Sequence, residues 1–278
     1  MYDFFRIAED HPKSGGTNVY PAFQLKYSDD IMIRGKDFYA LWLPDVGRWT
    51  TSEFEATEAI DNELYKYAKE HEERLKVFGN IRVLPIRECQ NDMVTKWHRY
   101  VQKDMRDSYV PLDETLVFAN DPISKEMYSS HRLPYALCEG PIDGWDMLVS
   151  TLYSPEERHK IEWSIGSIVT GASKSLQKFC VFYGEGGTGK STILNIIEKL
   201  FEGYTCTFDA KSLGSASSQF ALEPFKNGPL VAIQHDGDLS RIEDNTRLNS
   251  LVSHEVMLVN EKFKGQYPMA FKCFLFMG

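Results

Sequence analysis

Residues 179–203 read FCVFYGEGGTGKSTILNIIEKLFEG, and this stretch decides the fold. Its Gly184–Ser191 segment matches the P-loop pattern G-x-x-x-x-G-K-S in full. The apolar run Phe179–Tyr183 before it predicts a buried strand. Apolar side chains then recur at helical spacing over 190–202, and Gly203 closes the predicted helix. A strand, a glycine-rich turn and an amphipathic helix in this order indicate a nucleoside triphosphate site; the competing interpretation is a glycine-rich turn without a ligand.

The residue types in this turn suit phosphate. Glycines let the backbone wrap closely and take left-handed angles, and the amides of the turn and of the helix start attract anions. Lys190 is expected to reach the β- and γ-phosphates and the Ser191 hydroxyl to bind Mg²⁺. The expected cofactors are therefore ATP and Mg²⁺. The residues predicted to hold them are Gly184, Gly186, Gly187, Thr188, Gly189, Lys190, Ser191 and, as a lesser phosphate contact, Thr192.

Hydrolysis also needs acids near the metal. The strand Leu230–Ile233 ends in Gln234-His235-Asp236-Gly237-Asp238, and we expect it to lie beside the P-loop strand in a parallel sheet, with its carboxyl end near Mg²⁺. Asp236 is predicted to contact the metal through water, and Asp238, or less readily His235, to orient the attacking water. The predicted catalytic set is Lys190, Asp236 and Asp238. The competing interpretation is a polar turn after a strand.

A second basic feature follows at residues 257–267, MLVNEKFKGQY, which alternate apolar and polar side chains as a hairpin does. Lys262 and Lys264 are two residues apart and share one face. They are candidates for holding the backbone of single-stranded DNA, with Phe263 or Tyr267 stacking on bases. An exposed charged hairpin is the alternative.

The N-terminal half predicts a hairpin over 38–49, a helix over 53–77 and a second helix over 92–109. Ser52 and Glu55 form a capping box at the start of the first helix. The second helix carries a basic stripe that suits a phosphate backbone, although neighbouring aspartates also allow a solvated face. That stripe consists of Lys96, Arg99, Lys103 and Arg106.

The order of predicted elements gives an α/β fold with a mostly parallel sheet and helices on both faces, preceded by an α+β, largely helical N-terminal region. We place the boundary near residue 150, between domains 1–150 and 151–278. Ser154, Pro155 and Glu157 predict a helix start just after it.

Composition narrows the classes. The net charge of −9 over 278 residues argues against wholesale coating of DNA. No apolar run approaches the roughly 18 residues that span a bilayer, so no membrane partner is expected. Five scattered cysteines, never in a C-x-x-C pair, indicate a reducing compartment, and we expect a cytoplasmic protein.

Taken together, the motifs GEGGTGKST, LVAIQHDGD, VNEKFK and FLFMG resemble superfamily 3 helicases, the viral and phage group of AAA+ motors. Residues 133–172 are similar to the region that precedes the ATPase in poxvirus-type and phage primase-helicases, so the resemblance covers residues 110–278. It implies an AAA+-like P-loop fold, a homo-hexameric ring that moves 3′ to 5′ on single-stranded DNA by hydrolysing ATP, and a primase or primase-polymerase partner in the host cell cytoplasm. Lys262, and less surely Lys264, match the DNA-gripping lysine of that family.

Two departures bear on activity. Gly237 separates two acids that are adjacent in the family, which leaves the catalytic acid open. The family's sensor residue and arginine finger would follow Gly278, and the apolar stretch Phe271–Gly278 stops without a turn, as in a fragment whose hydrolysis is impaired. The alternatives are a P-loop kinase, which would need an arginine-rich lid, and an ATP-binding assembly module without helicase activity.

Overall fold

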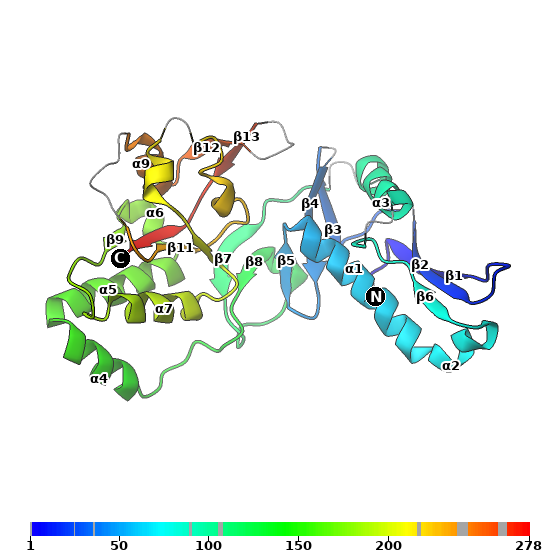
Figure 1. Cartoon of the computed structure of the whole chain (residues 1–278), viewed down its shortest axis with the longest axis horizontal. Helices are drawn as coiled ribbons and strands as arrows, with labels where there is room; N and C mark the ends of the chain where they lie inside the picture. The colour runs from blue at the N-terminus through cyan, green and yellow to red at the C-terminus, as the bar shows by residue number, and fades with distance from the viewer. Residues whose placement is uncertain are drawn as a thin grey trace. The chain divides into compact units, whose positions relative to one another are not determined.

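The computed structural model describes residues 2–24, 26–35, 37–88, 91–104, 108–215, 218–237, 244–260 and 266–278. The chain forms two compact units (Figure 1). Unit 1 comprises Met1–Glu114 and Pro122–Arg132, and unit 2 comprises Thr115–Asp121 and Leu133–Gly278. The expected boundary at residue 150 falls inside helix α4 (Asp143–Leu152), within unit 2.

Unit 1 contains two three-stranded sheets. In the first, β1 (Phe5–Asp10) pairs antiparallel with β2 (Thr17–Phe23), which pairs parallel with β6 (Ile81–Val83). The second is antiparallel, in the order β3 (Ile31–Arg34), β4 (Asp37–Leu43), β5 (Arg48–Thr50). The remaining elements of the unit are α1 (Glu53–Glu70), α2 (Glu72–Leu75), η1 (Lys76–Phe78), α3 (Asn91–Asp104), η2 (Lys125–Met127) and β8 (Ser129–Arg132).

The expectation of a largely helical N-terminal region is not confirmed, because both sheets lie there. The helix expected over 53–77 is divided into three elements: α1 ends at Glu70, and the short helices α2 and η1 follow it. The strands are short, and in β2 fully buried residues such as Val19 alternate with partly buried ones. The hydrophobic sequence pattern of these strands is therefore weaker than that of the neighbouring capped helix α1.

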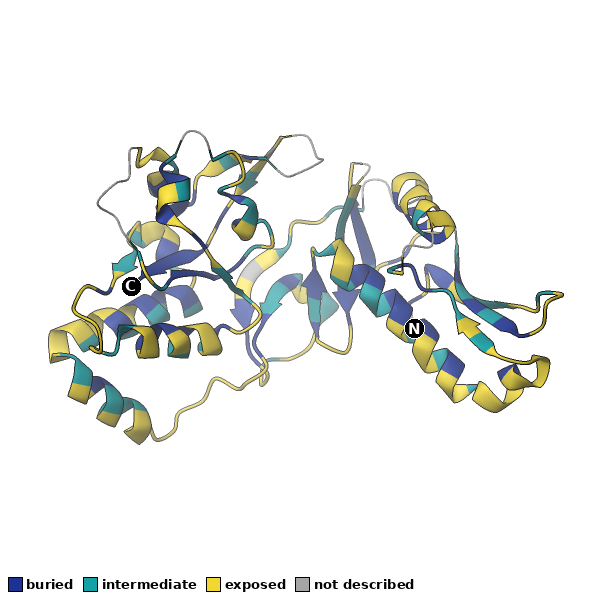
Figure 2. Ribbon diagram, viewed as in Figure 1, coloured by how far each residue is buried: buried dark blue, intermediate teal, exposed yellow. Residues whose placement is uncertain are grey.

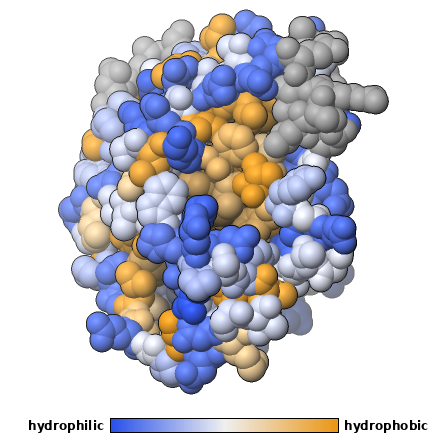
Figure 3. Space-filling view, turned by 90° about the vertical axis from the view of Figure 1, so that its left-hand side faces the viewer, coloured by the Kyte–Doolittle hydropathy of each residue, from blue (hydrophilic) through white to orange (hydrophobic). Residues whose placement is uncertain are grey.

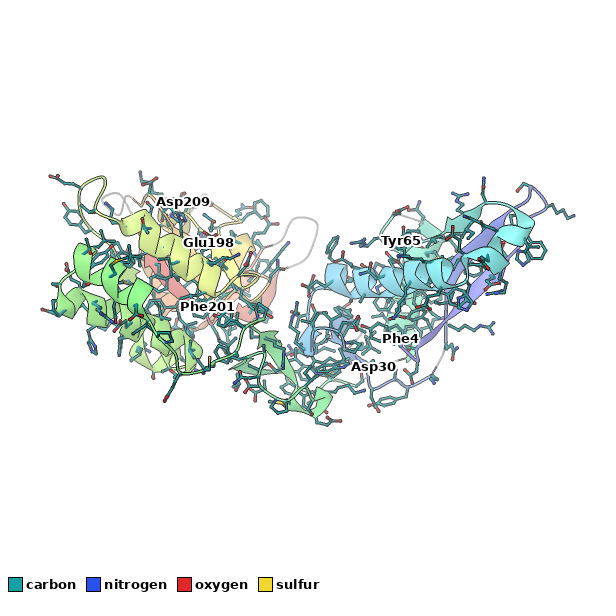
Figure 4. The ribbon with its side chains drawn as sticks, turned by 90° about the horizontal axis from the view of Figure 1, so that it is seen from below. Phe4, Asp30, Tyr65, Glu198, Phe201 and Asp209 are labelled. Atoms are coloured by element: carbon teal, nitrogen blue, oxygen red, sulfur yellow. The ribbon has the colours of Figure 1, made fainter. Side chains whose placement is uncertain are left out.

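Aromatic side chains form the core of unit 1. Phe4 is fully buried, and its ring stacks on that of Tyr100 with centroids 5.9 Å apart (Figure 4). Trp97 packs against both rings from the same helix, α3. On α1, the carboxylate of the buried Asp61 accepts hydrogen bonds from the backbone amides of Ile86 and Arg87, at 2.6 and 2.9 Å. These bonds fix the segment after β6 to α1.

Unit 2 is built on a four-stranded sheet in the order β10 (Thr205–Thr207), β11 (Val231–Gln234), β14 (Phe274–Met277), β9 (Cys180–Val181), and every pairing is parallel. The other elements are α4, α5 (Pro155–Val169), α6 (Ser173–Leu176), α7 (Lys190–Leu200), α8 (Ala210–Leu213), η3 (Glu223–Phe225), α9 (Thr246–Val252), and the antiparallel pair β12 (Val256–Val259) and β13 (Tyr267–Ala270). Strand β7 (Asp113–Val117) runs from unit 1 into unit 2.

Alternation along β14 explains why helices cover both faces of this sheet. Phe274 and Phe276 join the cluster that contains α5 and α7, whereas Leu275 and Met277 join the cluster that contains α8 and α9. Figure 2 shows the central strands β11 and β14 as buried and the outer helix faces as exposed. The buried strand expected over Phe179–Tyr183 is not confirmed, because it is the short edge strand β9, on which Val181 is exposed. The second unit is thus a mixed α/β structure on a parallel sheet.

One expectation about this sheet is wrong. Strand β11 does not lie beside β9, because β14 separates them. Since neighbouring strands lie about 4.8 Å apart, the carboxyl ends of β9 and β11 are about 10 Å apart.

Candidate functional site

The glycine-rich turn follows the carboxyl end of β9 and leads directly into α7. Its entrance is fixed by a hydrogen bond from the Phe182 amide to the Met277 carbonyl of β14, at 2.8 Å. Its exit is fixed because Ile193, Leu194 and Ile197 on α7 are fully buried against the sheet. Strand and helix therefore hold the turn at the carboxyl edge of the parallel sheet.

Backbone angles distinguish the four glycines of the turn. Gly187 and Gly189 take left-handed φ angles of +82° and +81°, whereas Gly184 and Gly186 do not have positive φ. The expectation of left-handed angles therefore holds for two of the four. At Gly189 space is also short, since a Cβ there would lie 2.6 Å from Leu152 Cδ1 at the end of α4.

Lys190 folds back over the turn. Its Nζ donates hydrogen bonds to the carbonyls of Gly184 and Glu185, each at 2.7 Å, and lies 3.5 Å from Thr188 Oγ1. The Thr188 hydroxyl in turn donates to the Glu185 carbonyl at 2.9 Å. The ammonium group thus sits on the turn itself, half-buried, where its positive charge faces any anion that the turn encloses.

The start of α7 adds further donors. Ile193 is the first residue of α7 whose backbone amide makes a helical hydrogen bond; it donates to the carbonyl of the N-cap residue Gly189 at 3.1 Å. The amides that precede it lie at the positive end of an 11-residue helix. Ser191 and Thr192 are exposed in this first turn. Lys190, the amides and the two hydroxyls together make a local site for an anion.

The acidic turn after β11 is fixed to the end of β14. The Gly237 amide donates to the Gly278 carbonyl at 2.7 Å, and the Gly278 amide donates to the Gln234 carbonyl at 2.8 Å. A Cβ at Gly278 would lie 2.4 Å from the His235 carbonyl oxygen, so the two chain segments touch. Asp236 is therefore held at the same sheet edge as the glycine-rich turn, while Asp238 lies outside the described residues.

His235 does not face the glycine-rich turn. Its Nε2 lies 3.9 Å from Oε2 of Glu198, which is labelled in Figure 4 and follows Lys190 by eight residues on α7. Eight residues span about 12 Å along a helix, so the imidazole lies well along α7 from Lys190. Asp236, the next residue, is exposed in the turn after β11.

Sequence reasoning missed two residues at this edge, Gln234 and Asp209. The buried Gln234 side chain accepts a hydrogen bond from the Ala210 amide at 2.9 Å and donates to Asp209 Oδ1 and the Asp236 carbonyl, both at 3.4 Å. Asp209 caps α8, and the hydrogen bond from the Ser212 hydroxyl lowers the pKa of its carboxyl group. The sequence signal that could have identified Gln234 is its polar amide side chain at the last position of an otherwise apolar strand.

The predicted DNA-contacting lysines, Lys262 and Lys264, lie outside the described residues, as does Phe263. The strands on either side of them, β12 and β13, pair antiparallel, with Val259 opposite Tyr267. Strand β12 exposes Val256 and Leu258. The expected hairpin strands are therefore present.

Other surfaces do not gather the predicted site residues. A cleft of about 350 Å³ lies in unit 1 and is lined by residues of α1 and the β4–β5 turn, including Arg48, Glu55 and Lys66. In unit 2, Met147, Trp163 and Val181 are exposed, and Figure 3 shows hydrophobic residues gathered near the middle of the face in view.

Among the described residues, no group of three or more His, Cys, Asp or Glu side chains is arranged to hold a metal ion. A magnesium ion would fit this site as a partner of phosphate oxygens, with few protein ligands, since Mg²⁺ keeps several waters and binds by one or two protein groups plus phosphates. None of the described helices is long and apolar enough to cross a bilayer.

Comparisons with known proteins give a limited match. A family model described as a family of unknown function (DUF5906) matches residues 182–278, which include the glycine-rich turn, the acidic turn and β14. A search of curated proteins gives no match.

Among solved structures, this chain is similar to one described as the apo structure of the NrS-1 C-terminal region (305–718), at 16% identity and a TM-score of 0.41. That match covers 51% of this chain and 34% of the other. Two further apo structures of the same region, described as A forms, match at 18% identity with TM-scores of 0.39 and 0.38, covering 51% of this chain and 33% of each. This chain thus spans about a third of the length of these structures.

Proposed function

We propose that unit 2 binds Mg-ATP at the glycine-rich turn and hydrolyses it, as the motor part of a superfamily 3-like helicase that moves on single-stranded DNA. One observation carries the nucleotide site: a parallel strand turns into a helix through left-handed glycines, with the Lys190 ammonium group folded onto that turn. A strand that leads into the turn, open amides and a fixed cation are what triphosphate binding requires.

Residue roles follow from position. Lys190 exchanges its two carbonyl partners for β- and γ-phosphate oxygens, and Ser191 binds the metal. Asp236 follows β11, whose carboxyl end lies about 10 Å from that of β9, and it would contact the metal through a water molecule. Gln234 fixes the backbone of Asp236. The movement on DNA, the homo-hexamer and the primase partner rest on the motif resemblance.

Binding of Mg-ATP to the full chain tests the site directly, by calorimetric titration of the wild type and of Lys190→Ala. We expect Lys190→Ala to weaken binding at least 100-fold, because the cation facing two phosphates is lost. The matched control is Lys199→Ala on the same helix, whose ammonium group pairs with Glu202 at 2.6 Å and which should bind normally. No binding by a folded wild-type chain would overturn the proposal.

ATP turnover with and without single-stranded DNA tests the motor. DNA should stimulate the wild type, and the double variant Lys262→Ala/Lys264→Ala should lose this stimulation while keeping its basal rate. Lys174→Ala/Lys178→Ala removes two exposed lysines elsewhere in unit 2 and should keep it. ATP binding without DNA-dependent turnover would instead favour an assembly module, and turnover that requires a small-molecule acceptor would favour a kinase.

A further inference from the structure

The exposed face of α3 carries a basic stripe that the nucleotide site does not use. Lys96, Arg99 and Lys103 are all exposed and lie at i, i+3 and i+7, so they share one face. Arg106, the fourth residue of the predicted stripe, lies outside the described residues. The opposite face is held in the core by Trp97 and Tyr100, which are nearly fully buried. Since the helix cannot rotate without exposing these rings, the stripe stays directed to solvent.

The charges of the stripe differ in their partners. Lys96 pairs with Asp92 at 2.6 Å. Within the described part of the chain, Arg99 and Lys103 form no ion pair. From Lys96 to Lys103 the stripe extends about 10 Å along the helix axis. Among the described residues it therefore presents two cations that have no acidic partner, beside Lys96, which pairs with Asp92.

A cation and two aromatic rings lie beyond the end of α3. The guanidinium of Arg34 sits over the ring of Tyr109, 5.0 Å from its centroid, and the Tyr109 ring meets that of Tyr39 edge-on at 4.7 Å. Arg34 is exposed while both rings are half-buried, so one face of the guanidinium remains open.

This stack is tied to the sheet near the helix. The Ile33 amide donates to the Ser108 hydroxyl at 2.9 Å, which anchors the chain after α3 along β3. Ser108 lies four positions after Asp104, the last residue of α3, so their Cα atoms are at most about 14 Å apart. The C-terminal end of the basic stripe and the Arg34–Tyr109–Tyr39 stack therefore lie on neighbouring segments in one region of unit 1.

We propose that this region of unit 1 is a second binding site for single-stranded nucleic acid, separate from the glycine-rich turn. Arg99 and Lys103 contact backbone phosphates, and Arg34, held flat on Tyr109, stacks on a base. A row of cations next to a planar stack suits a chain that alternates phosphates with flat bases. The net charge of −9 confines such binding to local patches of this kind.

Fluorescence anisotropy with a labelled 20-nucleotide single strand, without ATP, tests the site in the full chain. Lys262→Ala/Lys264→Ala serves as the background so that the predicted hairpin does not contribute. Arg99→Ala/Lys103→Ala should weaken binding and lower the slope of log affinity against log salt by about 1.4, from two lost phosphate contacts. Both positions are exposed on a helix where alanine is favourable, so the fold should persist.

Arg34 gives an independent test. Arg34→Ala should weaken binding about tenfold. Arg34→Lys should keep the salt slope but still bind more weakly, because lysine keeps the charge and loses the planar surface. The matched control is Lys66→Ala/Lys69→Ala, which removes two exposed lysines of α1 in the same unit and should bind as the background does. Equal losses in the control and in Arg99→Ala/Lys103→Ala would overturn the assignment.

The same measurement with a DNA and with an RNA oligonucleotide shows which nucleic acid binds, and binding of either supports the site. No binding of either by the background chain would overturn it and would leave the surface to a protein partner. Lys190→Ala should bind the strand as its parent does, because this site does not depend on ATP. Loss of ATP binding alone therefore counts against the proposed motor and not against this site.

Discussion

At the scale of single residues, the turn before α7 uses its glycines for different reasons. Gly186 has open space around it and no positive φ, Gly187 has open space but φ of +82°, and Gly189 combines φ of +81° with the contact to Leu152. We expect Gly186→Ala to leave stability and ATP binding almost unchanged. Gly187→Ala should cost about 1 kcal/mol of strain. Gly189→Ala should cost about 3 kcal/mol and impair ATP binding, because the backbone must move away from Leu152.

Urea unfolding and Mg-ATP titration of the three variants check this order. Leu152→Ala in the Gly189→Ala chain supplies the control, since a smaller side chain relieves the crowding but not the strain. A Gly189→Ala variant as stable as Gly186→Ala would contradict the argument.

At the scale of elements, the end of β11 is joined to the loop before α8 by one amide side chain. Gln234→Leu keeps the volume but leaves the Ala210 amide without its acceptor, which should cost about 1–3 kcal/mol. It also frees the Asp236 backbone, so the ATPase kcat should fall more than ATP affinity. Ile233→Val on the same strand loses one methylene, costs about 1 kcal/mol and should keep kcat. Equal kcat values in these two variants would show that Gln234 does not position Asp236.

A capping box starts α5. The Ser154 side chain accepts from the Glu157 amide at 3.3 Å, and Glu157 Oε2 accepts from the Ser154 amide at 2.8 Å. Ser154→Ala should lower the free energy of unfolding by about 1 kcal/mol. Ser175→Ala, at an exposed serine in α6, is the comparison and should change it by less than about 0.5 kcal/mol. The reverse order in thermal unfolding would contradict the role of the cap.

Local patterns predicted the elements well where a few neighbouring residues decide the outcome. The N-cap at Ser52, the capping box at Ser154 and the start of α7 at Lys190 are confirmed, because each depends on contacts within one helical turn. The box expected at Ser52 is incomplete, since the Glu55 carboxylate bonds to Arg48 and Thr50 instead of the Ser52 amide. The position of β14 between β9 and β11 could not be predicted, since apolar strands carry no signal for which neighbour they choose. The same limit hid Gln234, whose partner Ala210 is 24 residues away.

At the scale of the whole molecule, the two units have separate cores. Within the described residues, no hydrophobic cluster draws members from both units. Each unit buries its own aromatic and aliphatic side chains, so each should unfold as its own cooperative step. Perturbations confined to one unit should therefore move one transition and leave the other in place.

Acid provides such a perturbation for unit 1. Glu9 on β1 accepts two hydrogen bonds from the Arg74 guanidinium, at 2.6 and 2.9 Å, and one from the Tyr67 hydroxyl at 2.6 Å. Arg74 first and Tyr67 second lower the pKa of Glu9 from 4.5 to about 2. A lowered pKa stabilises the folded state above the unfolded value, and this contribution disappears as pH falls from about 4.5 towards 2.

Comparison of the wild type with Glu9→Gln isolates this group from other carboxylates. At pH 6 the variant should unfold at lower urea in the transition of unit 1, and the gap should narrow below about pH 4.5 and be nearly closed at about pH 2. The transition of unit 2 should coincide in both proteins. A gap that does not depend on pH would show that Glu9 stabilises unit 1 by packing and not by charge.

Nucleotide provides the converse perturbation, confined to unit 2. A ligand that binds only the folded state adds about 2.7 kcal/mol when its free concentration is about 100 times Kd. Mg-ATP should therefore raise the melting temperature of the unit 2 transition and leave that of unit 1 where it was, as calorimetry of the full chain would show. Lys190→Ala should abolish the shift and Lys199→Ala should keep it, because both change one lysine of α7 but only Lys190 lies on the turn. If both transitions rise together in the wild type, the units are coupled and the nucleotide is not confined to unit 2; if neither rises, the glycine-rich turn does not hold ATP.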